Sequence, residues 1–421
     1  MTGDRSRSDE TAVVDFLDDH REEVMTTALD LLAIDTQNPP GATREAVAAL
    51  EAWFADLGVA TERIAPDAAK PNLLATIPGE RDATLLFNGH LDTVPFDRDS
   101  WTRDPLGERD GDRVYGRGAT DMKGAVAAMY WVARAYVETD ITPQVDLSFA
   151  FVSDEETGGD AGLAALLEAN ALAADACVIG ETTCEGGRHS VTAADRGSVW
   201  LTLDAEGEAA HGSRPVLGVN AIDRCYAAVK RLREEFGERA LDLDPAVADL
   251  VAESVEYYAP TMGAEAARAL FEHPSINLGT IEGGESINAV PASARAEVDI
   301  RLAPGVYTPD LIADVRECVA DCEGIVVADL SWSVGTFEPP DSPLVAAAVE
   351  VAEGVTGDRV YRRSATGGGD AKKLRNAGIN TVEFGLGTDT VHAIDEYTTT
   401  DALAGNAAVY ARLPGAFADR L

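Results

Sequence analysis

Over the first 194 residues, short apolar runs alternate with longer segments in which apolar positions recur every three or four residues. The apolar runs predict buried strands at 71–79, 83–92, 145–155 and 175–181. The periodic segments predict helices at 9–34, 43–58, 121–138 and 162–170. Buried strands that alternate with helices indicate an α/β layered domain, and such domains bind ligands at the carboxyl ends of their strands.

The pattern changes at about Asp195. The following elements predict a β-α-β-β-α-β unit of the ferredoxin-like kind: strand 198–207, helix 220–236, a strand hairpin around a glycine turn within 275–302, helix 308–322 and strand 324–334. Within it, residues 237–275 form an additional, mostly helical excursion without an assigned role. The segment FEPPDSP indicates a linker where the first domain resumes. We therefore predict a first domain of residues 1–194 and 337–421, interrupted by an inserted α+β domain at 195–336.

The charge balance is strongly negative along the whole chain. The chain has 34 Lys and Arg residues against 73 Asp and Glu residues, and its formal net charge is −39 at pH 7. Such a field repels nucleic acid and anionic membranes, so we expect neither as a partner. Only five of the cations are lysine. An acidic, lysine-poor chain fits a protein from an extreme halophile, because concentrated salt screens the self-repulsion.

The sequence shows no targeting or membrane segment. It has no run of 18 apolar residues, and MTGDRSRSDE at its start lacks the apolar core of a signal peptide, so we expect a cytoplasmic protein. Five scattered cysteines without a CxxC pair are interpreted as reduced thiols, most of them small buried apolar residues.

Residues able to bind a metal follow the predicted strands. Four consecutive strand ends or helix starts supply an imidazole or carboxylates, and a loop near the end of the sequence adds a second histidine: His90, Asp92, Asp121, Glu155, Glu156, Glu181 and His392. Anions that converge on one edge of a sheet need a compensating cation. Two histidines with several carboxylates form a nitrogen and oxygen ligand set suited to zinc, with cobalt or manganese as substitutes.

Each of these residues alone also has a structural interpretation. His90 and Asp92 lie two residues apart on one strand face, and they can form a hydrogen-bonded pair. Asp121 can cap a helix, and Glu155 can be a solvated loop acid. The convergence of all the elements on one predicted edge favours the metal site.

Five motifs occur in the order GHLDTVP, GRGATDMKG, SDEETGG, GETT and VHAIDEY. In order and spacing this series resembles the M20 metallopeptidase family, specifically the branch of acetylornithine deacetylase and succinyl-diaminopimelate desuccinylase. The resemblance extends from about residue 25 to the end of the sequence. It implies a two-zinc exopeptidase-like catalytic domain, with a mixed sheet flanked by helices, and an inserted lid that usually also forms a homodimer.

The resemblance assigns ligands for two divalent ions. His90, Asp121 and Glu181 correspond to the ligands of one ion. Asp121, Glu156 and His392 correspond to the ligands of the other, so that Asp121 bridges the two.

The resemblance also assigns residues that act beside the ligands. Asp92 corresponds to the residue that fixes the imidazole of His90. Glu155 corresponds to the general base, and the irregular glycine-rich turn after its strand allows it and its neighbour to address the same site. The Asp121–Met122 peptide bond corresponds to one that is typically cis in this family.

The inserted domain supplies further candidates through the same resemblance. His211 corresponds to a histidine that reaches the active site of the partner subunit and polarises the scissile carbonyl. Asn288 and Arg301 match positions that contact substrate, and an arginine there suits a substrate carboxylate. Gly367 and Gly368 lie in a glycine-rich loop whose backbone N–H groups face the substrate in the family.

The function expected from this resemblance is cleavage of the amide bond of an N-acyl amino acid by metal-activated water. A dipeptidase or aminoacylase of the same family is the second possibility, and the two differ in whether the substrate carries an N-acyl group or a free amine. A non-catalytic binding relative is the third. Retention of Glu155 argues against it, because a binding protein has no need of a general base.

The charge composition predicts that folding depends on salt. In dilute buffer the unscreened repulsion should destabilise the folded chain, and multimolar potassium chloride should restore it. Thermal unfolding followed by circular dichroism across a salt series tests this. An equal unfolding midpoint and equal activity in dilute buffer would contradict the expectation.

Overall fold

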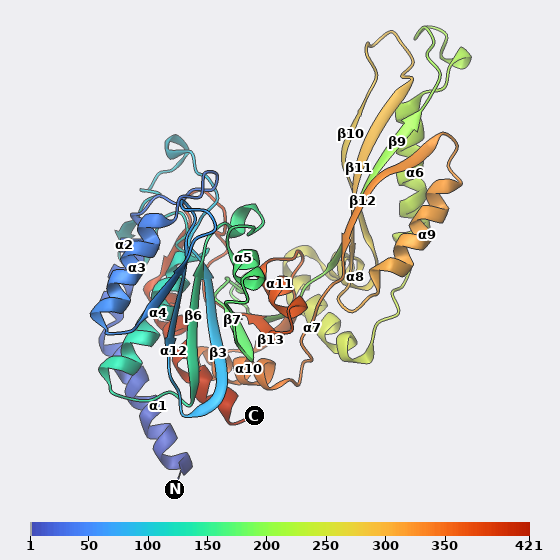
Figure 1. Ribbon diagram of the computed structural model, residues 1–421. Helices are drawn as coiled ribbons and strands as arrows, with labels where there is room; N and C mark the ends of the chain where they lie inside the picture. The colour runs from blue at the N-terminus through green and yellow to red at the C-terminus, as the bar shows by residue number, and fades with distance from the viewer. Residues whose placement is uncertain (1) are drawn as a thin grey trace. The chain divides into compact units, whose positions relative to one another are not determined.

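The apolar runs of the first domain form the inner strands of a mixed eight-stranded sheet (Figure 1), and the computed structural model describes residues 2–421. The strands follow one another across the sheet in the order β1 (Thr61–Ile64), β2 (Asn72–Ile77), β6 (Val145–Val152), β3 (Arg81–His90), β7 (Ala176–Ile179), β14 (Asn380–Glu383), β8 (His189–Ala194) and β13 (Val360–Ser364). β3 pairs in parallel with both β6 and β7. The last residues of β3 and β6, His90 and Val152, are direct partners, so the segments that follow these strands begin side by side.

Helices cover both faces of this sheet. They are α1 (Thr2–Asp19), α2 (Arg21–Leu32), α3 (Arg44–Asp56), α4 (Lys123–Glu138), α5 (Leu163–Glu168), α10 (Pro343–Thr356), α11 (Asp370–Asn376) and α12 (Thr400–Ala418). Figure 1 shows α4 and α12 on one side of β3 and β6, and α5 and α11 on the other. The single helix predicted at 9–34 is two helices, because the backbone leaves the helical conformation at His20, whose ring Nδ1 lies 2.7 Å from Phe16 O.

A small three-stranded sheet joins distant parts of the chain. It contains β4 (Glu108–Asp110), β5 (Arg113–Tyr115) and β15 (Tyr397–Thr399), with β5 in the middle. Tyr397 pairs with Tyr115, which fixes the segment before β15 beside the segment after β5. This pairing brings the loop of His392 to the start of α4.

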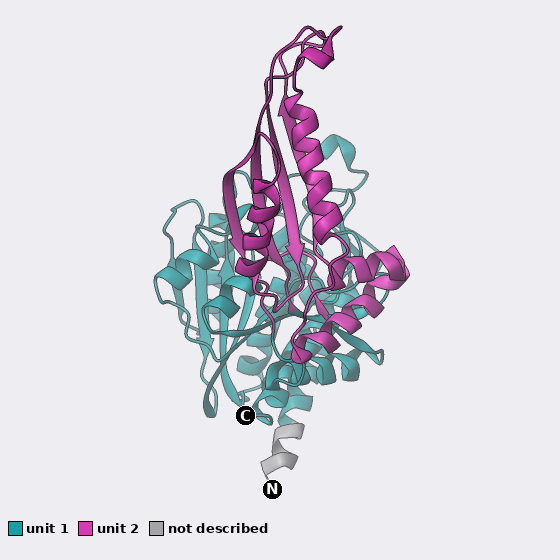
Figure 2. Ribbon diagram, turned by 90° about the vertical axis from the view of Figure 1, so that its right-hand side faces the viewer, with its two compact units in different colours: residues 1–193, 338–362, 369–421 teal, residues 194–337, 363–368 magenta. Residues whose placement is uncertain are grey.

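The chain divides into two units, coloured separately in Figure 2. Unit 1 contains the residues up to Ala193 together with Glu338–Arg362 and Gly369–Leu421. Unit 2 contains Ala194–Phe337 and Arg363–Gly368.

Unit 2 is built on a four-stranded antiparallel sheet. Its strands are β9 (Gly197–Glu206), β10 (Ser275–Gly283), β11 (Ser293–Leu302) and β12 (Ile325–Ser333), in the order β10-β11-β9-β12. Helices α6 (Ala221–Phe236) and α9 (Thr308–Ala320) pack on it. This is the ferredoxin-like order, and alternate residues of β9 and β11 enter the core with the apolar sides of both helices. The predicted hairpin consists of β10 and β11, and the connection around its glycines is a loop of residues 284–292.

The excursion at 237–275 forms two helices, α7 (Pro245–Met262) and α8 (Ala264–Glu272). Helix α7 binds the segment 363–368, which the sequence had placed in the first domain. The hydroxyl of Ser254 accepts a hydrogen bond from Ser364 N at 2.9 Å, and Arg363 donates to the hydroxyl of Tyr258 at 2.8 Å. These contacts explain why this segment belongs to unit 2.

Among residues 2–421, none of the helices combines the length and apolar character that a membrane crossing requires.

Candidate metal centre

Seven of the residues singled out in the sequence meet in unit 1. They come from the end of β3, the start of α4, the turn after β6, the loop after β7 and the loop before β15: His90, Asp92, Asp121, Glu155, Glu156, Glu181 and His392. Because β6, β3 and β7 are parallel neighbours, the segments after their carboxyl ends lie at one edge.

One group of donor atoms surrounds the imidazole of His90. Its Nε2 lies 2.9 Å from Asp121 Oδ1 and 3.4 Å from Glu181 Oε1. The other ring nitrogen, Nδ1, lies 2.9 Å from the backbone oxygen of Asp92, which fixes the ring orientation. Nε2 therefore points into the centre together with two carboxylates.

A second group surrounds the imidazole of His392. Its Nε2 lies 3.0 Å from Asp121 Oδ2 and 3.3 Å from Glu156 Oε2. The two oxygens of Asp121 thus face different histidines. Single donor atoms of His90, Asp121 and Glu156 also lie within 4.8 Å of one another, a spacing that one ion can span.

The clustered carboxylates of this centre favour bound cations. Burial by itself would lower the pKa of His90, yet the carboxylates of Asp121 and Glu181 raise it well above its usual value. Hydrogen bonds with Asp121 and Glu156 raise the pKa of His392 to about 10. Burial raises the pKa of Glu181, with the nearby Asp121 carboxylate adding to the effect. The carboxylates hold positive charge on both imidazoles, and divalent ions in the place of these protons would satisfy the same demand.

Glu396 fixes the backbone that carries Asp121. Its buried carboxylate accepts hydrogen bonds from the backbone N–H groups of Gly118, Thr120 and Asp121 at 3.0 to 3.2 Å, and it pairs with the buried guanidinium of Arg117 at 2.5 Å. The Asp121–Met122 peptide bond is cis, as the family resemblance implied. Met122, not Asp121, occupies the N-cap position of α4, so the helix-cap interpretation of Asp121 is wrong.

Asp92 connects His90 with both glutamates. Its Oδ1 accepts a hydrogen bond from Glu155 N at 3.1 Å, and its Oδ2 accepts one from Glu156 N at 3.2 Å. Asn38 Nδ2 also donates to Oδ2 at 2.8 Å. One buried carboxylate therefore sets the position of two successive residues of the turn.

The turn after β6 lets two adjacent glutamates serve one centre. Glu155–Thr157 form a 3-10 turn, preceded by Asp154 in the left-handed region at φ 69°. The irregular backbone removes the strand alternation that would send the two side chains to opposite faces. Burial, together with the nearby Asp370 and Glu156 charges, raises the pKa of Glu155 to about 7 against the lowering effect of His90.

The other predicted site residues belong to unit 2. His211 forms an isolated β-bridge with Ala289, the residue after Asn288. The predicted site residues His211 and Asn288 are therefore neighbours. Arg301 lies near the far end of β11 and pairs with Asp299 at 2.8 Å. Gly367 and Gly368 lie in the segment held by α7. Their roles stay predictions.

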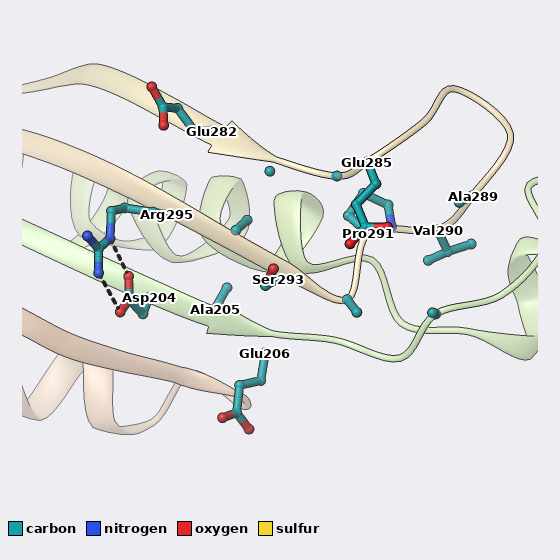
Figure 3. A pocket seen from close by; sticks show the side chains of 15 residues that line it. Asp204, Ala205, Glu206, Glu282, Glu285, Ala289, Val290, Pro291, Ser293 and Arg295 are labelled. Atoms are coloured by element: carbon teal, nitrogen blue, oxygen red, sulfur yellow. Dashed lines mark hydrogen bonds and ion pairs between the residues drawn. The ribbon is translucent and has the colours of Figure 1, made fainter.

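A pocket of about 630 Å³ adjoins the loop of Asn288 within unit 2 (Figure 3). Arg295 is the one cation among its lining residues, and it is paired with Asp204 at 2.7 Å. Glu206, Glu282 and Glu285 also line the pocket, so its charge opposes an anionic ligand.

A sequence model of peptidase family M20/M25/M40 matches residues 86–415. The chain belongs to this family. It is therefore a metallohydrolase, and the predicted fold class, a mixed α/β catalytic fold with an additional small antiparallel sheet, is confirmed. The acetylornithine deacetylase of Klebsiella pneumoniae (strain 342) is 33% identical over 307 residues, which are 70% of this chain and 72% of that protein.

Two solved structures of this M20 family share the fold. The M20 family metallo-carboxypeptidase Sso-CP2 from Sulfolobus solfataricus matches with a TM-score of 0.77 and 20% identity over 94% of this chain and 99% of that one. The YXEP protein of Bacillus subtilis, a dinuclear metal-binding peptidase from the M20 family, matches with a TM-score of 0.65 and 15% identity over 96% of this chain and 100% of that one.

Sequence reasoning missed the residues that hold the M20 centre in place. Glu396 lies inside the VHAIDEY motif and Arg117 inside GRGATDMKG, but the motifs do not reveal that the two pair. Asn38 lies in TQNPPG, after a predicted helix and before two prolines. Nothing in this local sequence indicates that its side chain contacts Asp92.

We expect the Glu396→Gln variant to be strongly destabilised. The substitution leaves the Arg117 guanidinium buried without its counter-charge, a change that typically costs about 3–5 kcal/mol. Chemical denaturation of the metal-free protein measures the loss. The Glu22→Gln variant is the control, because it breaks the exposed pair of Glu22 with Arg109 and should change stability little. Equal stability of the two variants would contradict the role of Glu396.

Proposed function

We propose that this protein is a metal-dependent amidohydrolase that cleaves the amide bond of a small N-acyl amino acid. The observation that carries the proposal is the placement of Asp121, whose two carboxylate oxygens face two separate sets of donors. The 33% identity to an acetylornithine deacetylase supports a deacylase over other reactions of the family.

The proposed ligands of one ion are His90, Asp121 and Glu181, and those of the other are Asp121, Glu156 and His392. The donor set of imidazole nitrogens and carboxylate oxygens suits Zn²⁺, with Co²⁺ or Mn²⁺ as substitutes. Two such ions, when bound, lower the pKa of water and polarise the scissile carbonyl.

Glu155 is the proposed general base. Its carboxylate takes a proton from the attacking water and then passes it to the leaving nitrogen. Asp92 supports this role, because its carboxylate holds the Glu155 backbone N–H and its backbone oxygen holds the His90 ring.

Unit 2 supplies the proposed substrate contacts. His211 would polarise the scissile carbonyl from the partner subunit of a homodimer formed through this unit. Arg301 would bind a substrate carboxylate, with Asn288 and the backbone N–H groups of Gly367 and Gly368 completing the site. Neutralising Arg301 would then raise KM for acidic substrates more than it lowers kcat.

We predict chelator-sensitive hydrolysis of at least one N-acyl amino acid. The zinc-loaded protein in multimolar potassium chloride is assayed with N-acetylornithine, N-succinyl-diaminopimelate, N-acetyl-lysine and a simple dipeptide, each with a chelator control. Turnover of one acylated substrate supports the deacylase. Turnover of the dipeptide alone would assign the protein to the peptidases, and no turnover of any of the four would contradict the proposal.

We predict that Glu155→Gln lowers kcat by about 100-fold or more, because an amide cannot accept the proton of water. Metal content should stay unchanged, since Glu155 is not among the proposed ligands. Asp160→Asn is the matched control, as Asp160 is an exposed acid of the same loop. Wild-type turnover in Glu155→Gln would remove Glu155 from the mechanism.

A further inference from the structure

A thiol, an imidazole and a carboxylate lie in a row in unit 1, outside the proposed ligand set. Cys184 Sγ is 3.2 Å from His189 Nδ1. The opposite ring nitrogen, His189 Nε2, is 3.7 Å from Asp358 Oδ2. The thiol and the imidazole are half-buried, so a small reagent can reach them, and the carboxylate is exposed.

The local sequence builds this arrangement. Cys184 lies in the loop between β7 and β8, and His189 is the first residue of β8. Gly186 and Gly187 adopt φ values of 56° and 73°, a left-handed conformation that reverses the chain. The reversal places the histidine back beside the cysteine.

The geometry gives His189 the role of a base toward the thiol. Nε2 lies 3.7 Å from the carboxylate of Asp358, a position that favours the ring N–H on Nε2 and leaves Nδ1 to accept the S–H proton. Burial lowers the pKa of His189, against the opposing charge of Asp358, which favours the neutral ring that can accept a proton. This is the arrangement of an activated nucleophile with an oriented base.

The other cysteines lack this environment. Cys177, Cys225 and Cys318 are buried, and burial raises the pKa of each thiol. Cys322 is half-buried like Cys184, and its thiol also donates to a backbone oxygen, that of Cys318 at 3.4 Å, but among residues 2–421 no hydrogen bond joins it to an imidazole. Cys322 is therefore a reference of similar exposure within the same protein.

We propose that Cys184 is a reactive thiol that exchanges with low-molecular-weight disulfides. His189 Nδ1 takes the thiol proton, and the sulfur attacks one sulfur of the reagent. A new S–S bond forms as the old one breaks, and the leaving thiolate recovers the proton from His189. The protein thiol is oxidised to a mixed disulfide, and the reagent is reduced to one equivalent of free thiol.

The loop of Cys184 also contacts both sides of the candidate metal centre. Thr183 N donates to Gly385 O at 2.9 Å, and the Cys184 thiol donates to the same oxygen at 3.6 Å. Gly385 packs closely on the backbone of Glu181. Gly186 N donates to the carboxylate of Asp389 at 3.0 Å, three residues before His392.

A bulky group on Cys184 would therefore displace segments next to Glu181 and His392. We infer that the mixed disulfide lowers the rate of amide hydrolysis, and this part of the inference rests on the proposed function. The chemical reactivity of Cys184 itself does not depend on that function.

The reactivity is tested by alkylating the native full-length protein with iodoacetamide at neutral pH and following each cysteine by peptide mass spectrometry. Cys184 should react about tenfold or more faster than Cys322, a modest gain for a positioned base. His189→Gln should reduce the Cys184 rate to that of Cys322. Asp358→Asn alters only an exposed side chain, so it should keep the fold and slow Cys184 by a smaller factor.

Equal rates at Cys184 and Cys322 in the wild-type protein would overturn the proposal. So would an unchanged Cys184 rate in both variants, because the imidazole would then have no part in the reactivity. Thermal unfolding of each variant verifies that a slower rate does not come from misfolding.

The consequence for activity is tested with oxidised glutathione on the metal-loaded enzyme. Amide hydrolysis should fall as Cys184 becomes modified and return after a thiol reductant is added. Cys184→Ser should keep its activity throughout. Full modification of Cys184 with unchanged turnover would overturn the inhibitory role. A protein without hydrolase activity on any substrate would refute the proposed function, while the alkylation rates would still decide whether Cys184 is reactive.

Discussion

The sharing of one carboxylate between two histidines is the constraint on which the rest of the centre depends. Asp121 can face both His90 and His392 only if its backbone is held rigidly and if its neighbours tolerate several anions at close range. Concentrated negative charge away from water is costly unless cations compensate it. The centre is thus a region of unfavourable repulsion that the fold creates and that divalent ions would relieve.

The fold opposes this repulsion with directed backbone hydrogen bonds. The carboxylate of Glu396 accepts hydrogen bonds from backbone N–H groups just before the cis peptide bond. The carboxylate of Asp92 accepts hydrogen bonds from the backbone N–H groups of the two glutamates. Neither acid is among the proposed metal ligands. They convert flexible loops into supports of fixed geometry, which is what precise positioning of ligands and a base requires. The parallel strands bring the metal-binding residues to one edge of the sheet, and the buried acids fix the positions of these residues there.

The sequence predicted what depends on periodicity and on motif order. It placed the inner strands, the main helices of the first domain and the ferredoxin-like unit, and it named the residues that now meet at the centre. It could not predict pairings between distant polar residues, such as Arg117 with Glu396, because each residue alone has no local signal. The role of α7 was missed for the same reason, since its contacts are with Arg363 and Ser364.

A shorter-range feature was also missed. The contact of His189 with Cys184 was not predicted, although the two residues lie only five positions apart in the sequence. Proximity in sequence did not predict contact, because the chain between them must first reverse through two glycines with positive φ.

The pair of Arg117 and Glu396 joins positions 279 residues apart in the sequence. Contacts of such separation form late, because a long chain must be closed before they contribute any stability. A partly folded chain in which the large sheet has formed, but the segment before β15 has not yet docked, would carry Asp121 on an unsupported loop. The arrangement of the metal-binding residues is therefore complete only after the segment before β15 has docked.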